Sequence, residues 1–293
     1  MSFLFADEGP DIEPGERKVF LATTSYDNPD AAYTFSIQRT REALSQAGIK
    51  SAYFLLSGNC HVDDARNSIV REFLLGDCSE LIFIDADVSW KTDNIIDLCS
   101  YDVDLVGGVY PHRKQIEKDK AELPVRMLPD VSGPDDRGLM EVEGLPTGFM
   151  RIKRRVLAEM AKRSDSFWNN VDRKRKVPLI FERTYDKETD MRWGGDINFC
   201  RKWRDMGGKV HAVYEMVLGH TGKVIIEGSL GSGLRRIGGT TIMEICQIIS
   251  EKKETAQHYA EAINHIDNQW GARDDVLFTC VAMAREAKGD ILE

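Results

Sequence analysis

The sequence has no apolar run long enough to cross a membrane. No stretch approaches the roughly 18 consecutive apolar residues that mark a transmembrane helix. The segment Met1–Glu8 also lacks the basic region and the long apolar core of a signal peptide. These two absences predict a soluble, cytoplasmic protein.

Cysteine pairs and an excess of positive charge are absent as well. The six cysteines are scattered along the 293 residues and none forms a C-x-x-C pair, so the sequence predicts neither a zinc site nor a disulfide framework. Buried free thiols are expected instead. The net charge of −9 opposes general binding to polyanions.

What the sequence does contain is an alternation of short apolar runs with amphipathic segments. With 42% hydrophobic residues, the chain can bury a large core. Strands are expected at 19–23, 51–56, 81–84, 104–110 and 209–214, and helices at 33–47, 64–75, 92–99, 154–162 and 194–206. This order is typical of a mainly parallel sheet flanked by helices, so the predicted fold class is α/β.

The composition of the chain also predicts its division into regions. Residues 1–17 are acidic and contain proline and glycine, which suggests a flexible lead. Residues 18–227 hold the expected sheet, interrupted by a long charged loop at 111–137. Residues 228–293 begin with a glycine-rich linker and continue with two helical segments, at 241–263 and 275–288. We expect these helices to form an appendage that serves oligomerisation or acceptor binding.

The most informative segment is Glu80-Leu-Ile-Phe-Ile-Asp-Ala-Asp87, an apolar run that ends in two carboxylates. An uninterrupted apolar run of this length is typical of a strand buried on both faces. Asp85 and Asp87 then lie at the carboxyl end of that strand, where open α/β sheets bind ligands. Two carboxylates there predict a site for Mn²⁺ or Mg²⁺ shared with substrate phosphates. The alternative is that they only cap the following helix.

This segment resembles the DxD motif of GT-A fold glycosyltransferases, in particular the family 2-like members. Further segments match in the expected order: Lys18–Ser25 resembles the first, nucleotide-binding strand, Asp64–Leu74 the helix before the DxD strand, Trp193–Trp203 the acidic segment that opens a helix, and Gly219–Gly222 the late histidine element. The resemblance implies a GT-A, Rossmann-like fold and a metal-dependent transfer of a sugar from a nucleotide-sugar donor, with a UDP-sugar favoured, to an acceptor hydroxyl.

The resemblance also assigns roles to residues. It implies that Asp85, Asp87 and His220 bind the metal, and that Asp196 is the catalytic base of an inverting reaction, although Gly195 stands where inverting members often have glutamate. Without the resemblance, His220 would be read as a structural residue and Asp196 as a helix cap.

Other candidates are expected around the two substrates. For the nucleotide they are Thr23, Thr24, Ser25, Tyr26, Arg66, Asn67, Asp85 and Ala86. Arginine suits phosphate binding, but Arg66 could equally pair with Asp63 or Asp64 on its own helix. For the sugar and acceptor the candidates are Tyr110, Gly148, Phe149, Trp193 and Gly194.

The acceptor is left open by the sequence. Residues 151–176 contain ten basic and three acidic residues, a local charge of +7 in a chain of −9. This run could recruit a polyanion such as a nucleic acid, or it could be an ordinary solvated face. Glycans, lipids, proteins and a modified base of phage DNA all remain candidates, and the last would place the protein in a host cytoplasm. The rival functions are a nucleotidyltransferase and a non-catalytic nucleotide- or sugar-binding module.

Overall fold

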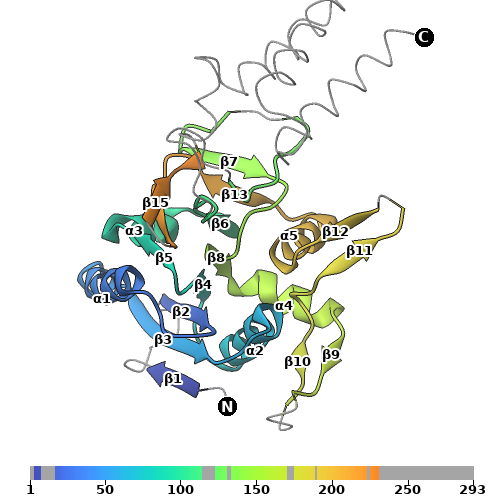
Figure 1. Ribbon diagram of the computed structural model, residues 1–293, viewed down its shortest axis with the longest axis horizontal. Helices are drawn as coiled ribbons and strands as arrows, with labels where there is room; N and C mark the ends of the chain where they lie inside the picture. The colour runs from blue at the N-terminus through green and yellow to red at the C-terminus, as the bar shows by residue number, and fades with distance from the viewer. Residues whose placement is uncertain are drawn as a thin grey trace, which may run out of the picture.

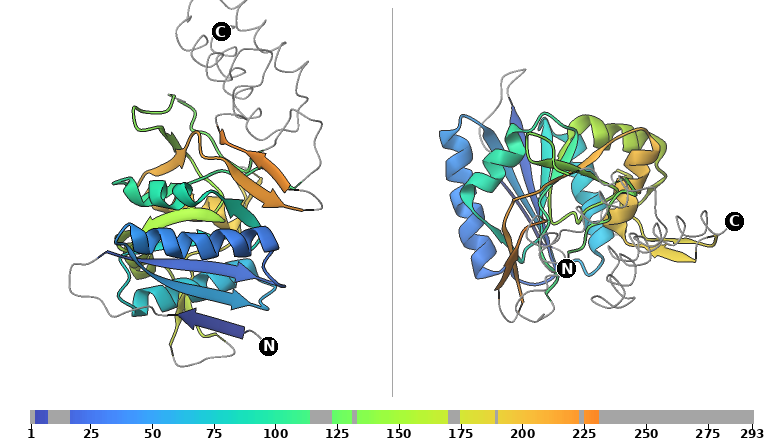
Figure 2. Two further views of the ribbon diagram at one scale, coloured as in Figure 1. Left: turned by 90° about the vertical axis from the view of Figure 1, so that its left-hand side faces the viewer. Right: turned by 90° about the horizontal axis from the view of Figure 1, so that it is seen from above.

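The computed structural model describes residues 3–7, 17–113, 123–130, 133–169, 175–188, 190–222 and 225–230. The two C-terminal helices and most of the glycine-rich linker expected from the sequence lie outside these residues. The described part is a mixed α/β structure with an eight-stranded sheet between two layers of helices (Figure 1, Figure 2). This confirms the predicted α/β class.

The large sheet has the strand order β1-β3-β2-β4-β8-β6-β13-β7. Its strands are β1 (Phe3–Asp7), β2 (Lys18–Ser25), β3 (Lys50–Ser57), β4 (Glu80–Ile84), β6 (Leu105–Gly107), β7 (Leu139–Val142), β8 (Phe149–Lys153) and β13 (Val210–Val213). Parallel pairing joins β3 to β2, β2 to β4 and β6 to β13. Strand β8 runs antiparallel between β4 and β6. Five of the eight strands therefore point the same way, and their carboxyl ends share one edge.

Two apolar layers explain why β4 is apolar from residue 81 to residue 84. Leu81 and Phe83 of this strand pack on one face, with α2 (Val62–Leu75), α4 (Arg154–Arg163) and α5 (Gly195–Asp205). Ile82 and Ile84 pack on the other, with α1 (Ala31–Gln46) and α3 (Thr92–Ser100). The view from above separates the two helical layers (Figure 2). All five residues of β4 are buried, as the sequence predicted.

Smaller sheets lie beside the main one. Strand β5 (Val88–Trp90) follows the DxD segment and pairs with β14 (Leu218–Thr221), which in turn pairs with β15 (Ile225–Gly228). Two hairpins, β9 (Ser166–Phe167) with β10 (Val177–Pro178) and β11 (Thr184–Asp186) with β12 (Met191–Trp193), complete the described elements. No helix of the described part is long and apolar enough to span a membrane.

Several expectations about regions need correction. The predicted lead contains β1, which pairs antiparallel with the otherwise open edge of β3. The predicted loop at 111–137 contains the buried residues Val125 and Met127, and Arg126 bridges to Gly144. Strands β7 and β8 were not predicted at all. The expected linker starts inside β15, which ends at Gly228.

The helix N-termini also differ from expectation. Helix α2 begins after His61, so Asp63 and Asp64 lie in its first turn and not at its cap. Helix α5 has Gly194 as its N-cap, and Asp196 lies in its first turn. Both places put carboxylates near the positive end of a helix, which is favourable without a capping bond.

Candidate active site

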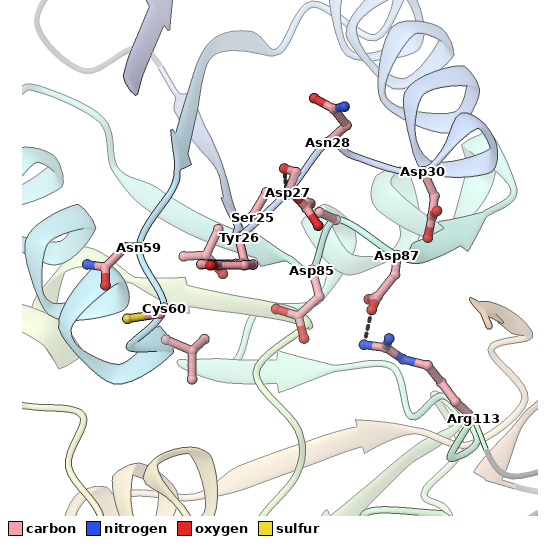
Figure 3. A pocket seen from close by; sticks show the side chains of 13 residues that line it. Ser25, Tyr26, Asp27, Asn28, Asp30, Asn59, Cys60, Asp85, Asp87 and Arg113 are labelled. Atoms are coloured by element: carbon pink, nitrogen blue, oxygen red, sulfur yellow. Dashed lines mark hydrogen bonds and ion pairs between the residues drawn. The ribbon is translucent and has the colours of Figure 1, made fainter. Parts of the chain in front are cut away.

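An open pocket of about 420 Å³ lies at the carboxyl edge of β2, β3 and β4 (Figure 3). It is formed by the segments that follow these three parallel strands, together with one side chain from further along the chain. The lining residues are Thr24, Ser25, Tyr26, Asp27, Asn28, Asp30, Asn59, Cys60, Val62, Asp85, Ala86, Asp87 and Arg113. This is the edge at which open α/β sheets bind ligands, and it is where the sequence placed the DxD motif.

The two DxD carboxylates turn to different partners. After β4 the backbone makes a turn in which the amide of Val88 donates to the carbonyl of Asp85 (3.1 Å), and the amide of Asp85 is held by Gly148 (2.9 Å). The Asp85 side chain lies beside Arg66, whereas that of Asp87 faces Arg113 (Figure 3). Asp85 and Asp87 therefore belong to two adjacent groups of charged residues.

Strand pairing brings His220 to Asp87. In the β5–β14 pair, His220 lies opposite Val88, and the amide of Thr221 donates to the carbonyl of Asp87 (2.8 Å). His220 Nε2 is then 3.6 Å from Asp87 Oδ1. Burial alone would raise the pKa of Asp87, but the charge of Arg113 opposes this, and the pKa lies below its usual range.

The hydrogen bonds of His220 define its tautomer. Its Nδ1 lies 2.6 Å from the carbonyl oxygen of Pro111, which only accepts hydrogen bonds, so Nδ1 carries a proton and donates it. Nε2 accepts from the Nε–H of Arg113 at 2.9 Å. The ring is therefore neutral, with its Nε2 lone pair directed at a cation, as in histidines that ligate metals.

The residues present suit a divalent cation only in part. Asp87 and the Nε2 atom of His220 form a two-ligand set of the right chemistry. Asp85 uses one oxygen for Arg66 and the other for Tyr110, and no group of three or more His, Cys, Asp or Glu side chains converges as a metal site within the described residues. A metal at this position would depend on substrate oxygens for its remaining ligands, which is usual for Mg²⁺.

Arg66 joins Asp85 to Asp196. Its side chain is 5% exposed, donates to Asp85 Oδ1 at 3.1 Å and lies 3.9 Å from Asp196 Oδ2. Burial disfavours the charge of Arg66, but the two carboxylates outweigh it and raise the pKa of Arg66. The expected surface pair with Asp63 or Asp64 is wrong, because Asp63 pairs with Arg183 (3.0 Å). Arg66 is also too enclosed by carboxylates to be the phosphate ligand that we expected.

The nucleotide candidates separate into two groups. Thr24, Ser25, Tyr26 and Ala86 line the pocket, as does Asp85. Thr23 does not: it is fully buried, and its hydroxyl bonds to that of Tyr33 at 2.5 Å.

Asn67 is likewise buried and points away from the pocket. Its amide oxygen accepts from the backbone of Ile180 (3.0 Å) and Phe181 (2.8 Å), and its amide nitrogen donates to the Phe181 carbonyl (2.7 Å). A direct contact with a nucleotide is excluded in this arrangement, so Asn67 has a structural role that the sequence did not reveal.

The sugar and acceptor candidates are similarly divided. Tyr110 donates to Asp85 Oδ2 at 3.1 Å, and burial together with Asp85 raises the pKa of Tyr110 well above its usual value. Gly148 packs so closely that a side-chain carbon there would overlap both Asp85 and the Tyr110 hydroxyl. Phe149, by contrast, is a fully buried core residue, so the expected pocket contact is wrong.

Trp193 and Gly194 precede α5. The Trp193 ring has the guanidinium groups of Arg201 (4.0 Å) and Arg126 (5.4 Å) near it, so the expected sugar platform already has cationic neighbours. Gly194 is the N-cap of α5, two residues before Asp196.

Sequence reasoning missed three charged residues of the pocket. Asp27 and Asp30 follow β2 directly, and the polar run Tyr26-Asp-Asn-Pro-Asp30 after a buried strand was a usable signal for them. Arg113 gave no signal, because it lies in a charged stretch without periodicity. Only the structure shows that it reaches Asp87 and His220.

The basic run at 151–176 does not form one surface. Arg151 is fully buried and pairs with Glu80 (3.3 Å), and Arg154 donates to the carbonyls of Phe73, Leu74, Gly76 and Cys78 beyond α2. The other described basic residues of α4 and its approach pair with Asp102, Asp104 and Glu159. Arg173 and Lys174 lie outside the described residues. The reading as a single polyanion-binding patch loses its support.

No family model and no curated protein matches this chain. Thirteen solved chains match it in structure. One of them, titled "Crystal Structure of A197 from STIV", is similar over 74% of this chain and 91% of that chain, with 17% sequence identity and a TM-score of 0.44. The chemistry of the site is therefore argued from its geometry.

Proposed function

We propose that the protein is a metal-dependent glycosyltransferase that moves a sugar from a nucleotide-sugar donor to an acceptor hydroxyl. The observation that carries the proposal is the meeting of Asp87 and His220 at the carboxyl edge of three parallel strands, beside Asp85. The pocket there has four carboxylates and one arginine in its lining. An anionic diphosphate is attracted to such a pocket only when a cation accompanies it.

Different residues around the pocket can bind different parts of the donor. Asp87 and His220 would hold Mn²⁺ or Mg²⁺, which would neutralise the charge that develops on the departing diphosphate. Tyr26 is 69% exposed within the pocket, and its ring can stack on a nucleobase. Ser25 is tied to the Asp27 carbonyl, which fixes the shape of the segment that would border the ribose.

Acceptor activation is assigned to Asp196. This residue lies in the first turn of α5 and is connected to Asp85 through Arg66. Its separation of 3.9 Å from Arg66 is longer than a hydrogen bond, so a carboxylate oxygen remains free to take a proton from the acceptor hydroxyl.

Binding and turnover together test the proposal. The wild-type protein should be stabilised against heat by UDP with Mn²⁺, and EDTA should abolish the shift. A panel of nucleotide sugars should then show one donor that is hydrolysed slowly in the presence of metal. Asp87→Asn should lose both effects, whereas Asp135→Asn, an exposed carboxylate in an ion pair with Arg137, should keep them.

The outcomes separate the rival functions. Metal-dependent binding of nucleotide without turnover of any nucleotide sugar would favour a binding module. Release of pyrophosphate from a nucleoside triphosphate would favour a nucleotidyltransferase. Absence of metal-enhanced nucleotide binding in the wild-type protein would contradict the proposal itself.

A further inference from the structure

Arg113 lies against both residues that we assign to the metal. Its Nη2 forms an ion pair with Asp87 Oδ2, and its Nε–H donates to His220 Nε2 at 2.9 Å. One guanidinium thus engages the carboxylate, as Figure 3 shows, and the imidazole lone pair at once. A divalent cation ligated by Asp87 and His220 would need these same two lone pairs.

The charges around the pocket explain why a cation is needed beside Asp87. Asp85 is neutralised by the buried Arg66, but Asp87 has no such buried arginine. Asp27 and Asp30 add two more carboxylates to the lining, and Arg113 is the one cationic residue among the lining residues. Without a cation beside Asp87, this face of the pocket would hold uncompensated negative charge.

The two arginines also differ in their freedom to move. The Arg66 side chain is 5% exposed, whereas that of Arg113 is 56% exposed. An arginine side chain that is more than half exposed can change rotamer without disturbing a packed core. Arg113 can therefore leave Asp87, while Arg66 is fixed beside Asp85.

We propose that Arg113 is an internal counter-cation that occupies the metal position in the free protein, yields it to the divalent metal, and then binds the diphosphate of the donor. This inference rests on the proposed function. It makes the guanidinium and the metal mutually exclusive at Asp87 and His220. It also gives the departing diphosphate a second positive charge from the rim of the pocket, suited to bidentate contact with phosphate oxygens.

The first test measures Mn²⁺ binding without nucleotide, by electron paramagnetic resonance of free Mn²⁺. Arg113→Gln should bind Mn²⁺ about tenfold more tightly than the wild type, the factor expected if the guanidinium fills the position about 90% of the time. Arg137→Gln is the matched control, because the Arg137 side chain is 54% exposed and pairs with Asp135 outside the pocket. Arg137→Gln also removes one positive charge, but it should leave the Mn²⁺ affinity unchanged.

Two further variants test whether the effect on Mn²⁺ binding comes from the charge at position 113 and occurs at Asp87. Arg113→Lys keeps the charge and should stay close to the wild-type affinity. Asp87→Asn should lose Mn²⁺ binding in both the wild-type and the Arg113→Gln background. The proposal is overturned if Arg113→Gln binds Mn²⁺ no better than Arg137→Gln, or if Asp87→Asn retains the metal.

The second test measures UDP affinity by calorimetry at saturating Mn²⁺. Arg113→Gln should now bind UDP about tenfold more weakly, because a charge-assisted contact to phosphate is lost. An unchanged UDP affinity would overturn the assigned contact. Failure of these binding results alongside metal-dependent sugar turnover would leave the glycosyltransferase proposal standing. Tighter Mn²⁺ binding without turnover of any nucleotide sugar would sustain the role of Arg113 and refute the transferase.

Discussion

Asp196 shares its buried neighbour Arg66 with Asp85, so one guanidinium lies between two carboxylates. Arg66 is itself held beside the ring of Phe181, 5.9 Å from its centre. The charge of Asp196 can therefore act in two ways: it favours the first turn of α5, and under the proposed function it would take the proton of the acceptor.

Asp196→Asn separates the two roles. We expect transfer to fall by about 10² or more, the usual loss for a positioned base, with metal-dependent UDP binding unchanged. Stability should fall by about 0.3–1 kcal/mol, because the first turn of α5 loses a favourable charge. Single-turnover transfer and urea unfolding measure these two effects.

Asp93→Asn provides the control, since Asp93 occupies the first turn of α3. It should reproduce the small stability loss and leave transfer intact. Near-normal transfer in Asp196→Asn would show that the acceptor is deprotonated by another group, as expected of a retaining mechanism.

At the scale of elements, Asn67 shows how helix α2, whose first residue lines the pocket, is tied to a distant segment of the chain. From inside α2 it binds the backbone of Ile180 and Phe181. Phe181 stacks on Phe199 of α5 at 4.6 Å and meets Phe83 of β4 edge-on at 5.6 Å. The buried side-chain amide of Asn67 therefore links α2 to α5 through the segment that contains Phe181.

Asn67→Ala should destabilise the protein by about 2–4 kcal/mol, because two buried N–H groups and one carbonyl lose their partner. Asn94→Ala is the comparison, since Asn94 is 8% exposed and donates one bond, to Val217 (3.3 Å). That change should cost about 1 kcal/mol. Urea unfolding of both variants measures the difference, and equal losses would contradict the role of Asn67.

The elements also show where sequence patterns succeed and fail. Strand β4 was predictable because Leu81–Ile84 are buried on both faces of the sheet, which gives an unbroken apolar run. Strand β8 was missed because Phe149-Met-Arg-Ile-Lys153 contains a charge in its centre. Arg151 is nevertheless fully buried, where it pairs with Glu80 (3.3 Å) and donates from Nη2 to the carbonyls of Tyr101 and Val103. Such partners come from distant segments, and a local pattern cannot reveal them.

The candidate site, like the strands, could be predicted from the sequence only in part. Asp85 and Asp87 follow a strong strand signal, so their place at the sheet edge could be read from the sequence. The closeness of His220 to Asp87 depends on the β5–β14 pairing, which the sequence did not predict; the resemblance implied only that the two residues share a metal. The distance from Arg66 to Asp196 and the contact of Arg113 with Asp87 depend on side-chain packing, and no spacing in the chain encodes them.

At the scale of the whole molecule, the cysteines report on which surfaces are open. Cys60 is exposed and lines the pocket, whereas Cys78, Cys99 and Cys200 are buried. Burial raises the pKa of Cys78 and Cys99 to about 11 and that of Cys200 to about 12. Because the thiolate is the reactive form and these values lie far above pH 8, the three buried thiols stay protonated at that pH.

Peptide mapping after brief iodoacetamide treatment at pH 8 should therefore find Cys60 modified well before Cys78, Cys99 and Cys200. UDP with Mn²⁺ should slow the modification of Cys60, and Mn²⁺ without nucleotide should not, because nucleotide would fill the pocket beside it. Modification of Cys60 at the same rate with and without UDP and Mn²⁺ would place the nucleotide elsewhere.

The pairing of β14 with β5 also has a consequence for synthesis of the chain. Arg113 and His220 are 107 positions apart, and the DxD carboxylates precede both. During translation the acidic half of the site leaves the ribosome long before the histidine exists. Strand β14 can pair with β5 only after β13, the last strand of the central sheet along the chain, has been synthesised, so the nascent chain carries Asp85 and Asp87 before the imidazole that lies beside Asp87. Under the proposed function, Asp87 and His220 could therefore hold a metal together only after the whole central sheet has been synthesised.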